Sequence, residues 1–286
     1  MSFTILLAAL PLVAGHTQVF AVQDQAKCLL PTAGGNNPIG DVSSPDMTCG
    51  KDAKPATEQC VVEAGNSMKL QYGHSQPADK IVDASHFGPC NAYLVPSTGA
   101  GSLPTKDGWF KIYQGIWDPQ NKWCVDKLRT DKGVLNVPIP SALKAGNYFL
   151  RSELNALHEA NREGGAQFYV NCFDIKVTGS GQGAPTKDEL VSIPGHLTSK
   201  TPGVIFNPYG NGDPHDSGVA YPTLGPKVCD LASPSYRVPD SPSSSPTTNS
   251  TTPLTVSLTA TSSTSAPSVP IPTQTTSYRT KKCRRK

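Results

Sequence analysis

Several features that would mark a membrane, nucleic-acid-binding or zinc protein are missing from this sequence. The apolar run at residues 5–14 is too short to cross a bilayer, which takes about 20 apolar residues, and no later segment approaches that length. The formal net charge is only +3, and no basic stripe or nucleic-acid-binding motif occurs in the body of the chain. No C-x-x-C pair is present, so a structural zinc site has little support. We therefore expect no membrane span and no nucleic-acid partner.

The N-terminus has the pattern of a secretory signal peptide. Residues 1–15, MSFTILLAALPLVAG, contain an apolar core and end with Val13 and Gly15 at the minus-three and minus-one positions of a signal-peptidase site. The segment before the core lacks Lys and Arg, which is atypical of signal peptides. Cleavage after Gly15 would make His16 the first residue of a secreted, extracellular protein.

The C-terminal segment, residues 232–286, is rich in Ser, Thr and Pro and ends in a basic run. Between residues 241 and 280, 23 of the 40 residues are Ser or Thr, and aromatic residues are almost absent. Such a segment cannot bury enough apolar surface to fold, so we expect a disordered, glycosylated tail with an N-glycan site at Asn249. It lacks the cysteine and aromatic density of a small binding module. The folded part is then a single domain over residues 16–231.

Short β-type segments separated by Gly, Pro, Asn and Asp clusters dominate this domain. No long pattern of 3.6-residue periodicity occurs, and the eight cysteines of an exported chain are typical disulfide formers. These features predict an all-β fold, an antiparallel β-sandwich of the immunoglobulin-like or fibronectin-like type with long loops. The expected strands are SMKLQYGH, CNAYLVP, GWFKIYQG, GVLNVPIP, GNYFLRSELNAL and AQFYVNCFDIKVTG.

The last of these strands carries two further expectations. Its apolar residues before and after Cys172 have opposite parity, so a bulge or bend near Cys172 is expected if all of them face one core. Gln167 and Tyr169 are two residues apart and project to the same side of the strand. This polar pair could be exposed to water or could line a site.

Three of the six histidines occupy positions that suit metal binding. His16, as a first residue, would offer both its α-amine and its imidazole, while His86 lies in the rigid turn SHFGP just before a strand. His158 follows the strand LRSELNAL. Nitrogen donors favour copper, because zinc sites usually add a carboxylate or thiolate and no such motif lies beside these residues.

A set of segments, in order, resembles one known family. The chain is similar to the family-nine auxiliary-activity lytic polysaccharide monooxygenases, fungal proteins once classified as family-sixty-one glycoside hydrolases. The resemblance spans roughly residues 16–229 and rests on the combination of segments rather than on any one. The matching segments are HTQVF, PIGDVSSPDMTCG, ASHFGPCNAYL, DGWFKIYQ, VPIPSALKAGNYFLRSELNALH, GGAQFYVNCFDIKVTG, IPG with TPGVIFN, and YPTLGP.

The resemblance implies a single copper ion held by two histidines. His16 would bind it through its α-amine and Nδ1, His86 through Nε2, and Tyr169 would lie at the axial position. His158 and Gln167 would hydrogen-bond oxygen species near the metal, which makes His158, Gln167 and Tyr169 the catalytic residues. Only a histidine at the first position can chelate through both its amine and its ring.

The resemblance also implies an activity. Copper cycling between Cu(II) and Cu(I), with O2 or H2O2 as co-substrate and an external reductant or electron-donor enzyme, would cleave cellulose or a related β-1,4-glucan at C1 and/or C4. We expect a monomer. Tyr221 matches a surface aromatic that would stack on the glycan, although it could instead anchor a loop. The alternative function is a non-catalytic copper-binding or cell-wall-associated protein on the same scaffold.

The disulfide pattern is only partly implied. Cys49 and Cys172 match the positions of a family disulfide. Separation along the chain alone suggests two further pairs, without fixing them. These are Cys90 with Cys124 and Cys28 with Cys229, leaving Cys60 and Cys283. The chain also departs from the family by carrying Ser152 where a histidine is usual.

Overall fold

The fold is given by a computed structural model that describes residues 15–22, 26–115, 117–118, 122–212 and 219–232, all within one compact unit. Residues 1–14 of the expected signal peptide and the tail from residue 233, including Asn249 and Cys283, lie outside the described residues. Among those described, no helix is long and apolar enough to cross a membrane.

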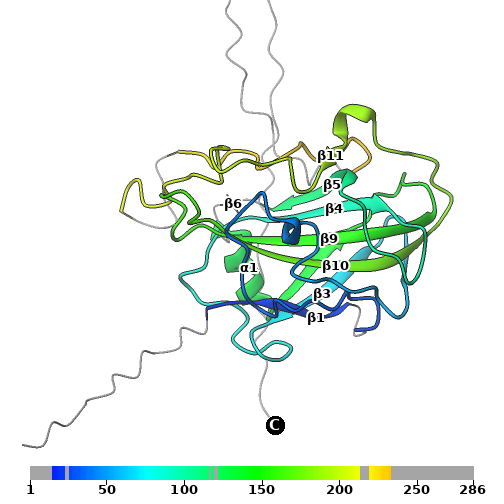
Figure 1. Cartoon of the computed structure of the whole chain (residues 1–286), viewed down its shortest axis with the longest axis horizontal. Helices are drawn as coiled ribbons and strands as arrows, with labels where there is room; N and C mark the ends of the chain where they lie inside the picture. The colour runs from blue at the N-terminus through cyan, green and yellow to red at the C-terminus, as the bar shows by residue number, and fades with distance from the viewer. Residues whose placement is uncertain (1–14, 23–25, 116, 119–121, 213–218, 233–286) are drawn as a thin grey trace, which may run out of the picture. The chain divides into compact units, whose positions relative to one another are not determined.

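The strands form two packed sheets, which confirms the predicted all-β sandwich (Figure 1). The smaller sheet, as described, has the order β1-β3-β8 and the larger the order β11-β5-β4-β9-β10-β2; pairing is antiparallel except between β10 and β2. The small sheet contains β1 (Gln18–Val22), β3 (Ser67–Gly73) and β8 (Val134–Pro138). The large sheet contains β2 (Cys60–Glu63), β4 (Cys90–Pro96), β5 (Asp107–Gly115), β9 (Gly146–Ala156), β10 (Gln167–Thr178) and β11 (Val191–Ser192).

Each of the six segments predicted to be strands forms one, as β3, β4, β5, β8, β9 and β10. Sequence alternation did not identify the shorter elements. These are β1, β2, β11, the hairpin of β6 (Trp117–Asp118) and β7 (Lys122–Trp123), the helix α1 (Cys124–Thr130), and the 3-10 turns η1 (Pro45–Met47) and η2 (Lys187–Glu189).

The large sheet is buried on both of its faces. One face packs on the small sheet, around residues such as Leu70, Leu150 and Phe173. The other is covered by loops, which bury Phe168 of β10 and Trp109 of β5. Figure 1 shows these loops wrapping around the sheet.

This double burial overturns the expected bend near Cys172. The register of β10 on β9 runs without a shift from Gln167, opposite Ala156, to Val177, opposite Gly146. The apolar residues of opposite parity belong to two different cores, one on each face, so a regular strand buries both sets.

Three disulfides tie loops to the large sheet. Cys49–Cys172 forms as the resemblance implied, with a Cα–Cα distance of 5.2 Å. Cys90–Cys124, suggested by separation, joins β4 to α1.

The suggested pair of Cys28 with Cys229 is wrong, because Cys28 pairs with Cys60. The Cys28 carbonyl accepts from Asp174 N, and Cys60 is registered beside Ile175, so both half-cystines meet next to the same stretch of β10. Cys229 instead lies beside β5, where its amide donates to the Lys111 carbonyl.

Candidate metal centre

The topology gathers His86, His158 and Gln167 at one end of the large sheet. Because β9 is antiparallel to both β4 and β10, its last residues lie beside the first residues of those strands. Leu154 is registered with Cys90 at the start of β4, and Ala156 with Gln167 at the start of β10. His86 just before β4 and His158 just after β9 therefore reach the same edge.

His16 joins this edge from the small sheet. It lies two residues ahead of β1, whose Val19 amide donates to Asn171 Oδ1 on β10 at 3.1 Å and so links the sheets beside the centre. The Nδ1 atom of His74, which follows β3, donates to the His16 carbonyl at 2.8 Å. The His16 side chain also forms a hydrogen bond with the Asn37 side chain, which accepts it.

The side chains of His16, His86 and Tyr169 face a common space. Their ring centroids are 6.1 Å apart for His16–His86, 6.0 Å for His16–Tyr169 and 6.1 Å for His86–Tyr169. The ring of His158 stacks at a tilt on that of His86, with centroids 4.3 Å apart. The structure thus brings together the histidines and the tyrosine that the sequence singled out.

Gln167 is fixed between Tyr169 and His158. The Tyr169 hydroxyl donates to Gln167 Oε1 at 2.7 Å, so the pair lies on one side of β10 as its parity predicted. The Gln167 Nε2 atom lies 3.4 Å from His158 Nε2, an interaction in which the amide donates and the ring nitrogen accepts. The amide orientation is therefore set by partners at both ends.

The imidazole of His86 is held through its Nδ1 side. Ser85 Oγ lies 3.0 Å from Nδ1, and Arg129 on α1 donates to the His86 carbonyl at 3.2 Å. Its Nε2 atom is buried and has no hydrogen-bond partner. The tautomer that donates from Nδ1 to Ser85 leaves a lone pair on Nε2, which is then free to bind a metal ion.

Burial keeps the three imidazoles neutral near pH 7. Burial, with smaller contributions from His158 and His16, lowers the pKa of His86 to about 4. Burial also lowers the pKa values of His16 and His158 and raises that of Tyr169. Neutral imidazoles are the form that binds a metal ion.

Gly15 packs directly against His86. A Cβ built on Gly15 would lie 2.5 Å from His86 Cε1 and 3.1 Å from Nε2, so no larger residue fits there without displacing the ring. The peptide that joins Gly15 to His16 therefore lies beside the unpartnered nitrogen. Cleavage of this peptide would create an amine at the same place.

The donor set fits one copper ion. Among the described residues, no three His, Cys, Asp or Glu side chains are grouped so as to hold a metal by themselves. Two imidazoles and the amine that cleavage after Gly15 would create would supply three nitrogens, and the unpartnered His86 Nε2 is one of these donors. Nitrogen donors of this kind suit copper more than zinc, calcium or magnesium.

The expectation of an exposed Tyr221 ring is wrong. Tyr221 is only 9% exposed, its hydroxyl donates to the Gly203 carbonyl at 2.9 Å, and its ring packs edge-on against Trp123 and Phe206. Its polar tip anchors a loop to the second core, which leaves no free face for a glycan.

The sequence did not identify the residues that support the histidines. Ser85, Asn37 and Arg129 act through bonds that depend on where their loops and α1 pack. Only Ser85 gave any signal, as the neighbour of His86 in the turn SHFGP.

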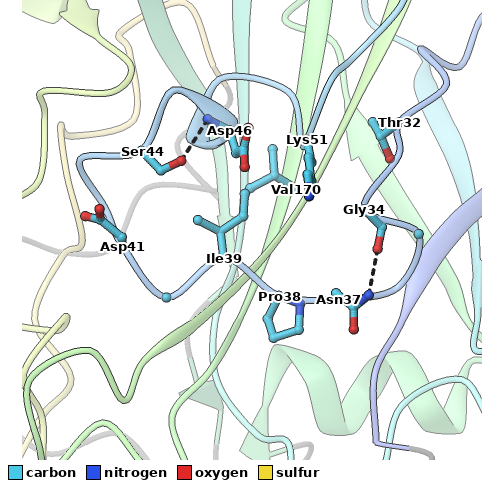
Figure 2. Close-up of a pocket in the computed structure, with 13 residues that line it drawn as sticks. Thr32, Gly34, Asn37, Pro38, Ile39, Asp41, Ser44, Asp46, Lys51 and Val170 are labelled. Atoms are coloured by element: carbon cyan, nitrogen blue, oxygen red, sulfur yellow. Dashed lines mark hydrogen bonds between the residues drawn. The ribbon is translucent and has the colours of Figure 1, made fainter.

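The loop that carries Asn37 also folds around an open cavity of about 310 Å³ (Figure 2). Asn37 Nδ2 donates to the Gly34 carbonyl at 3.0 Å, and Ser44 Oγ accepts from Asp46 N at 3.2 Å. Ile39 and Val170 form its floor in Figure 2. These bonds stiffen the loop beside His16.

Comparison with known proteins gives a consistent result. The model of Auxiliary Activity family 9 (formerly GH61) matches residues 12–217. An AA9 family lytic polysaccharide monooxygenase A of Aspergillus terreus is 39% identical over 240 residues, covering 80% of this chain and 63% of that protein. An AA9 family lytic polysaccharide monooxygenase B of Emericella nidulans is also 39% identical, covering 80% and 64%. The chain thus spans somewhat less than two thirds of the length of these relatives.

Solved structures match the whole fold. A structure described as CvAA9A superposes with a TM-score of 0.67 at 29% identity, covering 76% of this chain and all of the other. The extended catalytic domain of H. jecorina LPMO9A, also called EG4, gives a TM-score of 0.64 at 26% identity, covering 80% and 96%.

Proposed function

The chain belongs to Auxiliary Activity family 9, and from this premise we propose that it is a secreted, copper-dependent lytic polysaccharide monooxygenase that oxidatively cleaves β-1,4-glucan, such as cellulose, at C1 and/or C4. The observation that carries the proposal is the buried, unpartnered Nε2 of His86, whose ring centroid lies 6.1 Å from those of both His16 and Tyr169. A buried polar atom without a partner is costly, and a bound metal ion would remove that cost.

His16 and His86 are the copper ligands in this proposal. His16 would hold the ion through its α-amine and Nδ1 and His86 through Nε2, with the Tyr169 ring next to both histidines. Burial keeps that phenol protonated at neutral pH by raising its pKa, so it approaches the ion as a neutral group. When bound, copper supplies one-electron redox chemistry, with O2 or H2O2 as co-substrate and electrons from an external reductant or donor enzyme.

His158 and Gln167 orient the oxygen co-substrate. The Gln167 amide is held by Tyr169 and His158, so its direction toward the centre is fixed before substrate arrives. His158 has a second ring nitrogen, Nδ1, that is buried without a partner, and a proton can be held or released there.

The substrate is a polymer that lies across the end of the sandwich. His16, His158 and Gln167 are partly exposed at the strand ends, so the centre opens to the surface of the domain. A chain on the surface of a solid reaches such a centre without having to enter a cavity. The protein would act as an extracellular monomer, after cleavage at Gly15 and N-glycosylation at Asn249.

Electron paramagnetic resonance of the secreted protein with one equivalent of Cu(II) tests the metal centre. A tetragonal spectrum with nitrogen couplings is expected, and His86→Ala should lower copper affinity by more than about 100-fold, exceeding the usual effect of losing an outer partner. His16→Ala should act similarly. His215→Ala, at a position outside the described residues to which we assign no role, is the matched control.

Product analysis separates the enzyme from its alternative. Incubation of the copper-loaded protein with amorphous cellulose, ascorbate and peroxide should release oxidised oligosaccharides, and none should appear with His86→Ala. A normal copper spectrum without oxidised products would instead favour the non-catalytic copper-binding protein. Copper binding that survives both histidine substitutions would refute the centre itself.

A further inference from the structure

The first residues of the processed chain lie outside the ladder that holds β1. Pairing of β1 with β3 begins at Gln18, opposite Gly73, so His16 precedes the ladder by two residues. In the uncleaved chain the Gly15 carbonyl accepts from the Asp83 amide at 3.3 Å, and cleavage after Gly15 removes this anchor. Terminal residues are poorly ordered unless other contacts tie them down. The position of His16 after cleavage therefore depends on the bonds that it and the following residues make.

Three side-chain hydrogen bonds link this terminus to Gly73 and His74 at the end of β3. Thr17 Oγ1 donates to the Gly73 carbonyl at 3.3 Å, and Gln18 Nε2 donates to the His74 carbonyl at 3.4 Å. The shortest of the three runs in the other direction, from His74 Nδ1 to the His16 carbonyl at 2.8 Å. Because a carbonyl oxygen can only accept, this bond requires the tautomer of His74 that carries a proton on Nδ1.

His74 is itself held through its main chain. Its amide donates to the Asp79 carbonyl at 2.8 Å, and its carbonyl accepts from Asn36 Nδ2 at 3.2 Å. Asn36 Nδ2 also lies 3.0 Å from His74 Nδ1, but with the Nδ1 proton directed at His16 the amide donates to the carbonyl instead. The donor of the ring is thus presented to His16 from a fixed backbone.

This bond acts on the part of His16 that sets the direction of its α-amine. The peptide plane, the side chain and the amine nitrogen are all attached to the Cα atom. His74 holds the peptide plane through the His16 carbonyl, and Asn37 holds the ring by accepting its hydrogen bond. With two substituents of the Cα atom held, the third points in one direction. A ligand ordered before the metal arrives binds it at a lower entropic cost.

We propose that His74 is a positioning residue for the metal centre, which fixes the main chain of His16 so that the free α-amine faces the ion before the ion binds. The inference rests on the proposed function, because it requires cleavage after Gly15 and a set of ligands that includes the amine. His74 acts through His16 and does not itself hold the ion.

Competition titrations of the secreted protein with Cu(II) test this role with two variants of nearly equal size. His74→Leu removes the donor and should lower copper affinity about tenfold, the lower end of the usual effect of losing an outer partner. His74→Asn keeps an N–H group one bond from Cγ, where Nδ1 stands, and should bind within about threefold of the wild type. Electron paramagnetic resonance should show altered nitrogen couplings in His74→Leu and the wild-type spectrum in His74→Asn.

The metal-free protein distinguishes positioning from a role in the fold. Fraying of a terminus is a local opening, so the urea midpoint of the metal-free protein should be the same for the wild type, His74→Leu and His74→Asn. Gln71→Leu is the matched control, since it removes from the same strand a side-chain amide that donates to the Lys132 carbonyl at 3.0 Å. It should leave copper affinity unchanged.

Several outcomes would overturn the role of His74 alone. Wild-type copper affinity in His74→Leu would show that the amine needs no such anchor. Equal weakening by the Leu and Asn variants, or by Gln71→Leu, would show that the donor on Nδ1 is not what matters. A lower urea midpoint that accompanies the loss of affinity would assign His74 to the packing of the turn after β3.

A further variant covers the case in which His74→Leu does not fold. Asn36→Leu leaves the ring in place and removes the bond that holds the His74 carbonyl. It should lower copper affinity about threefold without changing the urea midpoint. An unchanged affinity would then overturn the inference.

Failure of the proposed function would look different. A wild-type protein without the tetragonal Cu(II) spectrum would overturn the metal centre and the role of His74 together. A wild-type spectrum that His74→Leu alters, in a protein that yields no oxidised oligosaccharides, would support the role of His74 and overturn only the activity.

Discussion

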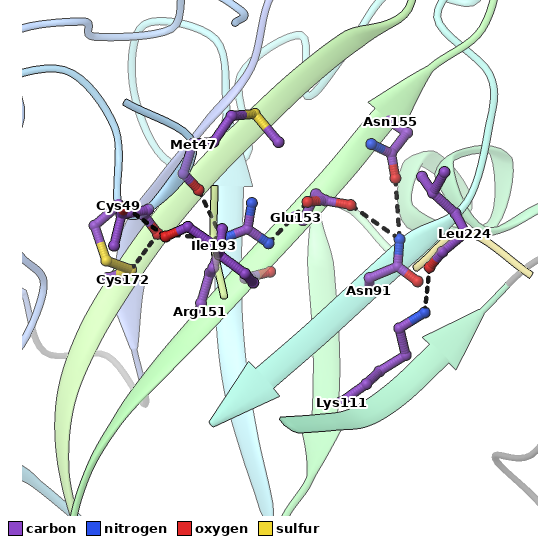
Figure 3. A network of polar contacts seen from close by, with 12 residues as sticks. Met47, Cys49, Asn91, Lys111, Arg151, Glu153, Asn155, Cys172, Ile193 and Leu224 are labelled. Atoms are coloured by element: carbon purple, nitrogen blue, oxygen red, sulfur yellow. Dashed lines mark hydrogen bonds and ion pairs between the residues drawn. A yellow bond between two sulfur atoms is a disulfide. The ribbon is translucent and has the colours of Figure 1, made fainter. Parts of the chain in front are cut away.

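Two clusters of polar side chains in this domain are built in opposite ways. The first is the histidine centre at the strand ends. The second, which we call the arginine cluster, consists of Arg151, Glu153, Asn91, Asn155 and Lys111 on β4, β5 and β9 (Figure 3). Both contain buried polar side chains, but the two clusters differ in charge and in how their members are paired.

In the arginine cluster, the charges of Arg151 and Glu153 are buried and form an ion pair. Arg151 Nη1 lies 2.7 Å from Glu153 Oε2, with both side chains fully buried, and Arg151 Nε donates to the Met47 carbonyl at 3.0 Å. Asn91 Nδ2 donates to Glu153 Oε1 at 3.1 Å and to Asn155 Oδ1 at 3.0 Å. Burial would raise the pKa of Glu153, yet Arg151 beside it holds that pKa below its ordinary value.

In the histidine centre, the imidazoles are neutral and lie close together. The rings of His16, His86 and Tyr169 approach within about 6 Å without bonding to one another, and His86 Nε2 has no partner. Breaking a buried ion pair destabilises a fold, whereas neutral metal-binding groups gathered at a partly exposed edge suit a binding site. This difference predicts that substitutions in the two clusters will have opposite signatures.

The largest effect is expected from Glu153→Gln. It leaves the Arg151 charge buried without its counter-ion, which should lower the free energy of unfolding by about 4 kcal/mol. Urea unfolding of the secreted protein measures this. The fraction that remains folded should still show the wild-type copper spectrum, because the bonds of the cluster do not involve His16, His86 or His158.

Glu58→Gln is the control for this prediction. Glu58 pairs with Lys27 at 2.6 Å, but both side chains are more than half exposed, so its loss should change stability by less than about 0.5 kcal/mol. If both variants lost similar stability, or if Glu153→Gln altered the copper spectrum of the folded protein, the distinction between the clusters would fail.

The sequence predicted the fold because each long strand has enough residues for its alternation to show. It failed on β2 and β11, where four and two residues are too few for a pattern. The expected bend at Cys172 failed for another reason, since parity arguments assume one core and β10 serves two. The alternation of apolar residues along a strand therefore indicates which residues are buried, but not whether one core or two cores bury them.

For the site, the sequence predicted which residues gather but not which side chains are exposed. His16, His86, His158, Gln167 and Tyr169 came from position and resemblance, and the structure brings them together. Exposure could not be predicted in the same way, since it depends on loop packing between segments far apart in sequence. Tyr221 and Tyr209 both lie in Gly- and Pro-rich loops, yet one is 9% and the other 37% exposed.

An intermediate effect is expected from His196, whose ring lies 5.9 Å from that of Tyr93 at the rim of the arginine cluster. Burial, with Arg151 adding to it, lowers its pKa to about 4. The unfolded chain therefore binds a proton near pH 6.5 that the folded protein binds only near pH 4. The stability due to neutral His196 is fully present above pH 6.5 and is lost as the pH falls toward 4.

The size of this loss follows from the two pKa values. The wild type should lose about 2 kcal/mol of unfolding free energy between pH 7 and pH 5 from this residue. His196→Gln, which cannot titrate, should show a correspondingly flatter profile over that interval, measured by urea unfolding at each pH. Parallel profiles for the two proteins would show that the ring is solvated, and that the rim of the arginine cluster is as open as the histidine centre.

The smallest effect is expected from Ser85→Ala, which tests how the open centre is tuned. Ser85 Oγ lies 3.0 Å from His86 Nδ1 and favours the tautomer that leaves Nε2 free to bind. Without it, both tautomers become accessible, and copper affinity should fall about threefold to tenfold in competition titrations, while the unfolding free energy of the metal-free protein changes by less than about 0.5 kcal/mol. Ser102→Ala removes a hydroxyl bonded to the Gly99 carbonyl in a distant turn and should leave copper affinity unchanged. An effect of Ser85→Ala on stability instead of affinity would place Ser85 with the residues that hold the fold, as in the arginine cluster, and would remove it from those that prepare the metal site.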